Sequence, residues 1–157
     1  MIEFKGELTG ECRKFLLKKQ VKIQAIASII TATIFMIPTI LAAIFWKPIA
    51  LIFLIPLGLL VIFSLVTPSK SDQKIFMPKR VYVDTEEESI VHECEKMERF
   101  HMLYSVERVL DYGEWYYFIF NYANRDLYFV CQKSLLTNGT LEEFEELFEG
   151  KIERRTQ

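Results

Sequence analysis

The longest hydrophobic stretch of the chain lies near its start. Residues 23–46 form a run of 24 positions without Asp, Glu, Lys or Arg, and residues 49–66 form a second run of 18. As helices these runs are about 36 and 27 Å long, and a hydrocarbon core is about 30 Å thick. Lys47 and Pro48 separate the runs and favour a turn. The pattern predicts a transmembrane α-helical hairpin with spans 23–46 and 49–66.

Basic residues flank this block on its two outer sides, whereas the predicted connecting loop has Lys47 alone. Short cytoplasmic flanks of membrane spans carry an excess of Lys and Arg. We therefore predict a multi-pass protein of the plasma membrane with both termini in the cytoplasm. The residues expected at the membrane surface are Arg13, Lys14, Lys18, Lys22, Trp46, Lys79 and Arg80.

Residues 1–22 are predicted to form a basic cytoplasmic arm. The first six residues alternate between polar and apolar, which favours a short strand that joins the downstream sheet. Residues 9–22 are expected to form a helix with Thr9 as its N-cap, lying at the membrane interface with its basic side on anionic lipid headgroups. The alternative is a positive flank continuous with the first span. The apolar stripe of this helix would contain Cys12, Phe15 and Leu16.

Residues 69–157 are predicted to form a separate cytoplasmic domain made mostly of strands. Short β-rich runs alternate with polar turns, and their connections are short enough to make neighbouring strands antiparallel. The predicted strands are residues 75–83, 89–94, 100–104, 106–110, 115–122 and 127–131.

One helix is predicted near the end of the chain, at residues 140–150. Thr140 followed by Glu143 is typical of a capping box, and Gly150 is a suitable C-terminal stop. Leu141, Phe144, Leu147 and Phe148 form one apolar stripe, which must pack on something. The fold class expected for the domain is α+β, a small, strongly bent antiparallel sheet capped by this helix.

The last strand and this helix, LYFVCQKSLLTNGTLEEFEELFEGKI, resemble the C-terminal part of the YcxB-like family of bacterial membrane proteins. The resemblance implies a short N-terminal segment, two spans and a domain of pleckstrin-homology-like (PH-like) character. It implies no catalytic residue. The sequence departs from the family pattern at residues 104–109, which lack a Trp, and at Val130 to Lys133, where Ile-Pro-Lys is commoner.

Charge is distributed unevenly along the chain, although its formal total is only -2. Residues 69–157 contain 12 Lys and Arg against 18 Asp and Glu, so the predicted domain is acidic. Phosphate backbones attract basic proteins, and we therefore expect no nucleic-acid partner.

No motif for nucleotide, metal or nucleophilic chemistry occurs in the sequence. His92 and Cys94 are two apart on a predicted strand and share a face, and Cys131 is within reach across the sheet. The spacing is unlike that of zinc sites, and reduced structural thiols are the favoured interpretation. We therefore assign no catalytic, cofactor-binding or metal-ligating residue, and we predict that the protein is not an enzyme.

Aromatic residues crowd the strand predicted at residues 115–122 and the start of the next one. Because strand side chains alternate, rings occupy both faces, and one face is left for a partner. The predicted partner-binding residues are Trp115, Tyr117 and Tyr128.

Two functional hypotheses follow. The first is a non-catalytic interaction or regulatory module, anchored in the membrane, that binds another protein or a second copy of itself. The alternative is a module that senses anionic lipid. A weaker alternative is a transporter subunit, since Pro38 and Pro56 lie near the middle of the predicted spans.

Overall fold

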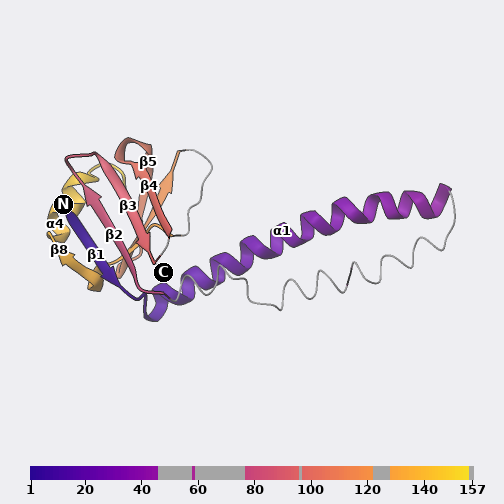
Figure 1. Ribbon diagram of the computed structural model, residues 1–157, viewed down its shortest axis with the longest axis horizontal. Coiled ribbons are helices and arrows are strands. Elements are labelled where there is room, and N and C mark those ends of the chain that lie inside the picture. The colour runs from indigo at the N-terminus through magenta and orange to yellow at the C-terminus, as the bar shows by residue number, and fades with distance from the viewer. Residues whose placement is uncertain (46–57, 59–76, 96, 122–127, 156–157) are drawn as a thin grey trace. The chain divides into compact units, whose positions relative to one another are not determined.

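The computed structural model describes residues 1–45, 58, 77–95, 97–121 and 128–155 (Figure 1). The chain divides into two compact units. Unit 1 contains Met1–Leu16 together with Lys74–Gln157, and unit 2 is Leu17–Gln73. The predicted boundaries at residues 22 and 69 therefore differ from those of the structure. The N-terminal segment is part of the α+β unit, not a separate arm.

Helix α1 (Gly10–Phe45) is continuous from the end of the first strand into the apolar block. The stretch Gly10–Leu41 is long and apolar enough, by length and composition, to cross a membrane. Its polar hydroxyls are satisfied within the helix, because Thr31, Thr33 and Thr39 each donate a hydrogen bond to the carbonyl four residues earlier. Among the described residues this is the one candidate span. The predicted second span and the Lys47-Pro48 turn lie outside the described residues.

Unit 1 contains two β-sheets, not the single bent sheet predicted. The five-stranded sheet has the order β4-β3-β2-β1-β8 and the four-stranded sheet the order β7-β6-β5-β9. The strands of the first sheet are β1 (Ile2–Gly6), β2 (Lys79–Asp84), β3 (Ser89–Cys94), β4 (Met97–Met102) and β8 (Leu136–Asn138). Those of the second are β5 (Val106–Asp111), β6 (Trp115–Phe120), β7 (Val130–Gln132) and β9 (Ile152–Arg154).

The N-terminal strand β1 lies inside the five-stranded sheet, between β2 and β8. Ile2 is opposite Val83 and Phe4 is opposite Val81, so the apolar residues of both strands share the inner face. The predicted strand in the first six residues is confirmed. It explains why the two ends of the sequence belong to one unit, since β1 joins segments that are separated by more than 70 residues.

Most predicted strands are confirmed, and β3 has the bounds expected from its alternation. Two strands are missing from the prediction, β8 and β9, each of three residues. The expectation that all neighbours are antiparallel is wrong for β9, which runs parallel to β5. Three residues are too few for alternation to show, and β9 pairs with β5 only because α4 brings the chain back.

The main core lies between the two sheets and is closed by helix α4 (Leu141–Leu147). The ring of Phe144 contacts Phe4 of the first sheet at a centroid distance of 5.5 Å and Tyr116 of the second at 4.6 Å. Phe148 packs edge-on against Phe118 at 5.3 Å. Such pairs each add about 0.5–1.5 kcal/mol beyond the area they bury. The predicted capping helix is therefore confirmed, and its apolar stripe fills the space between the sheets.

The start of α4 has the predicted capping box. The Glu143 N–H donates to Thr140 Oγ1 at 3.1 Å, and the Thr140 N–H donates to Glu143 Oε2 at 3.0 Å. Gly150, which has a φ of +76°, lies in the turn that ends the helical segment and leads to β9. These two local signals determine where α4 begins and where the chain returns toward the sheet.

Candidate interaction surface

The predicted partner-binding residues of β6 are buried by the protein itself. Trp115 is 2% exposed and Tyr117 is 1% exposed. The first turns of α1 cover them, and the Phe15 ring lies 5.8 Å from Trp115 and 6.0 Å from Tyr117. Leu8, Cys12 and Leu16 are buried in the same cluster. The prediction that Trp115 and Tyr117 bind a partner is therefore wrong, because residues 8–16 already occupy this face.

The start of α1 is also held by polar contacts. The side-chain oxygen of Gln132 accepts a hydrogen bond from the Thr9 N–H at 3.0 Å, and its amide nitrogen donates to Thr9 Oγ1 at 3.0 Å. The Thr9 carbonyl accepts the first helical bond, from the Arg13 N–H. The stripe predicted to lie on the membrane interface, Cys12 and Leu16, therefore packs on the four-stranded sheet instead.

Tyr128, the third predicted partner residue, is half-buried and contacts basic side chains. The guanidinium of Arg99 lies 4.4 Å from the centre of its ring, and the His92 ring lies 5.5 Å away. Its carbonyl accepts a hydrogen bond from Lys79 Nζ at 3.2 Å. Tyr128 therefore links β7 to the inner side of the five-stranded sheet.

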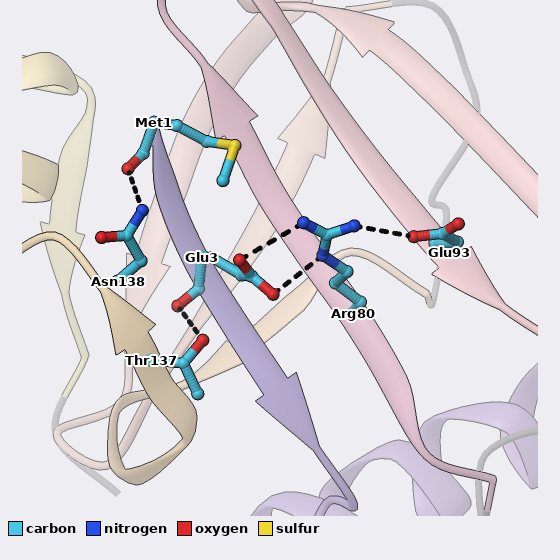
Figure 2. Close-up of polar contacts among 6 residues, drawn as sticks. All are labelled: Met1, Glu3, Arg80, Glu93, Thr137 and Asn138. Carbon is cyan, nitrogen blue, oxygen red and sulfur yellow. Dashed lines mark hydrogen bonds and ion pairs between the residues drawn. The ribbon is translucent and has the colours of Figure 1, made fainter.

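Two of the predicted membrane-surface residues are engaged within unit 1. Lys79 is 8% exposed, with its ammonium directed to Tyr128. Arg80 donates to both carboxylate oxygens of Glu3, the shorter at 2.8 Å, and to Glu93 at 3.3 Å (Figure 2). Burial makes Lys79 unsuitable for lipid headgroups, so that prediction is wrong. Arg80 is partly exposed, but two carboxylates already neutralise it.

The other predicted membrane-surface residues lie on or beyond α1. The side chains of Arg13, Lys14, Lys18 and Lys22 are exposed, which is compatible with headgroup contact. Lys14 forms an ion pair with Glu11 at 2.7 Å, one helical turn earlier. Trp46 lies outside the described residues.

Cysteine and histidine side chains occupy the interior. His92 faces inward on β3 opposite Val81, and Cys94 is on the same face. The three cysteines are free and buried, and burial raises the pKa of the Cys131 thiol. A protonated, enclosed thiol is a poor nucleophile. Within the described part of the chain no three His, Cys, Asp or Glu side chains are grouped to hold a metal.

The largest exposed rings of unit 1 lie elsewhere, on β4 and on the 3-10 turn η2 (Leu103–Ser105) that follows it. Phe100 is 65% exposed, Met102 40% and Tyr104 73%. We call these three residues the β4 surface. Exposed aromatic and methionine side chains are enriched where proteins bind partners. The sequence pattern does contain this signal, because Phe100, Met102 and Tyr104 alternate, but alternation does not say which side is covered.

The β4 surface is next to an unpaired strand edge. β4 is the last strand in the order, and no other described strand pairs with it on its outer side. The Leu103 N–H bonds to the Glu88 carbonyl, so residues of the same parity on β4 bond to β3. The main-chain groups of Glu98 and Phe100 therefore point to the outer edge. The Met102 carbonyl is taken by Ser105 Oγ at 2.6 Å.

The outer face of the five-stranded sheet is acidic around these residues. Strands β2 to β4 direct Asp84, Glu93 and Glu98 outward, against the single cation Arg80. Burial and the nearby carboxylates of Glu98 and Glu93 raise the pKa of Tyr82, whose row continues through Val91 to Phe100. Within the described residues Glu98 has no ion-pair partner. The surface thus combines exposed rings with negative charge.

Comparison with known proteins gives no family model, no curated protein and no solved structure that matches this chain.

Proposed function

We propose that the chain is a membrane-anchored, non-catalytic interaction module that binds a partner protein through the β4 surface. The observation that carries the proposal is the exposure of Phe100, Met102 and Tyr104 beside an unpaired strand edge. Apolar side chains at such an edge gain free energy when a partner covers them, and free N–H and C=O groups add directional hydrogen bonds.

The anchor of this module is α1, supported by the length and composition of Gly10–Leu41 and by the exposure of its apolar side chains. The finer proposal is a hairpin, with residues 49–66 as the second span and both termini in the cytoplasm. Its support is the second uncharged run of 18 residues and the basic flanks.

We also propose that the two sheets and α4 form a PH-like domain of the YcxB-like kind. The support is the order of the parts: strands of two sheets enclosing one core, then a C-terminal helix whose Phe144 and Phe148 close that core. This layout is compatible with a binding role, and it assigns no catalytic residue.

The proposed function is tested by photo-cross-linking in intact cells. A photoreactive amino acid at position 104 is expected to form a protein adduct, because Tyr104 lies in the β4 surface. The adduct is expected to disappear in the added variant Phe100→Glu. A photoreactive residue at position 149, where Glu149 is exposed beyond α4, is the matched control and is expected to give no such adduct.

The same experiment separates this function from its alternatives. Adducts with lipid at position 104 would favour the lipid-sensing module and contradict ours. A protein adduct that survives Phe100→Glu, or that forms equally at position 149, would show that the β4 surface is not the binding site.

A further inference from the structure

We infer that the partner contributes a basic, extended segment that adds as a strand to the outer edge of β4. The inference rests on the proposed function and goes beyond it, because it specifies the conformation and the charge of what binds. Three features support it: the main-chain groups of the edge, the alternation of side chains along β4, and the charge of the surrounding face.

The main chain provides the first step. The N–H and C=O groups of Glu98 and Phe100 are directed away from β3, as the register and the Leu103–Glu88 bond require. An added strand satisfies such groups in the same way as a native neighbour does. The Ser105 hydroxyl already occupies the Met102 carbonyl, so the available edge is short. A partner segment of about three to five residues fits it.

Side-chain alternation provides the second step. Glu98, Phe100 and Met102 project from the outer face, while the residues between them point to the core. Residues on an added strand would lie directly beside these three, at the spacing of cross-strand pairs. An apolar side chain beside Phe100 would extend the row that runs from Tyr82 through Val91. A cation would then lie beside Glu98.

Charge provides the third step and selects the occupant. Arg80 is the one cation that β2 to β4 direct outward, and it is paired with Glu3 and Glu93 (Figure 2). Glu98 and the turn residues Glu86 and Glu87 remain exposed. Lys and Arg are attracted to these carboxylates and also bind over exposed rings such as Phe100 and Tyr104.

Other occupants fit this face less well. An anionic membrane surface and an acidic peptide would both be repelled by the carboxylates. A second copy of the chain would bring its own Glu93 and Glu98 beside those of the first, and like charges side by side are unfavourable. A basic segment of a different protein meets no such opposition.

The inference is tested with a displayed library of random nine-residue peptides, selected on the full chain in detergent micelles. Selected peptides are expected to be rich in Lys and Arg and to alternate these with apolar residues. On the selected peptides, Glu98→Lys is expected to weaken binding about tenfold at low salt, because an attraction becomes a repulsion. The matched control Glu149→Lys makes the same charge change beyond α4 and is expected to leave binding unchanged.

The backbone part is tested with one further probe. Methylation of every second main-chain nitrogen in the best peptide is expected to weaken binding more than tenfold, because those N–H groups would bond to the β4 edge. Variants that still show the near-UV circular dichroism of the wild type are used, so that loss of binding is not loss of fold.

Several results would overturn the inference. Selected peptides without basic bias, peptides that bind Phe100→Glu as well as the wild type, or a library that yields no binder would each do so. Concentration-dependent self-association of the chain that Glu98→Lys strengthens would point to a second copy instead. If position 104 still forms a protein adduct in cells, the proposed function survives such a result; if it does not, both fail.

Discussion

Strands β6 and β4 both carry large side chains on faces that point away from the main core, but the two faces have different surroundings. On β6, Trp115 and Tyr117 are enclosed by the first turns of α1. On β4, Phe100 is 65% exposed and lies at the edge of its sheet. The same kind of side chain thus stabilises the fold in one place and is available for binding in the other. What differs is whether another segment of the chain covers it.

The largest expected effect is on the covered face. Trp115→Ala should lower the free energy of unfolding by about 3–5 kcal/mol, because it leaves a cavity among Phe15, Tyr112 and Leu16. Urea unfolding of the detergent-solubilised chain, followed by near-UV circular dichroism, measures it. A loss below about 1 kcal/mol would mean that α1 does not seal this face.

Removing the cover should have the next largest effect. Leu16→Ala is expected to cost about 2–4 kcal/mol, because Leu16 is fully buried against the β6 face. In a Trp46→Phe background, acrylamide should then quench the fluorescence of Trp115 more strongly. Leu147→Ala, at a leucine that is 38% exposed on α4, is the control and should change neither quantity much. Equal quenching in both variants would contradict the proposed cover.

The main core should show a pH dependence that the open face lacks. Burial and the 2.6 Å hydrogen bond to Glu145 raise the pKa of Tyr116. Because its folded pKa lies above the value of about 10 in an unfolded chain, its contribution is intact below pH ~10 and is lost as the pH rises further. Tyr116→Phe should cost about 1 kcal/mol at pH 7.

Unfolding measured between pH 7 and pH 11 tests this expectation. The difference in stability between wild type and Tyr116→Phe should shrink above pH ~10, since the phenol that gives the wild type its advantage is then ionised on unfolding. A difference that stays constant up to pH 11 would show that the hydroxyl does not remain protonated in the fold.

The smallest effect is expected on the open face. Phe100→Ala and Tyr104→Ala should each change the free energy of unfolding by less than about 0.5 kcal/mol, because little of either ring is buried. The measurement is the same urea titration that is used for Trp115→Ala. A loss above about 2 kcal/mol would mean that these rings pack against the protein, and the comparison between the two faces would no longer hold.

The sequence predicted the elements better than their surroundings. Strand β3 and helix α4 follow from alternation and a capping box, which are local signals. The strands β8 and β9 are too short to show a pattern, and β9 is parallel to β5 because of where the chain returns. For the candidate site, alternation placed Trp115 and Tyr117 on one face but wrongly left that face open.

Local chemistry by itself determined where the apolar block lies, where α4 starts and which residues of each strand share a face, because caps and periodicity depend on neighbours in the sequence. Only the tertiary structure decided that residues 8–16 cover β6, that Lys79 is buried, and that β4 is an open edge. These outcomes depend on contacts between segments more than 50 residues apart. Burial is a property of what packs on a side chain, and a face that can be read from alternation acquires its role only when that neighbour is known.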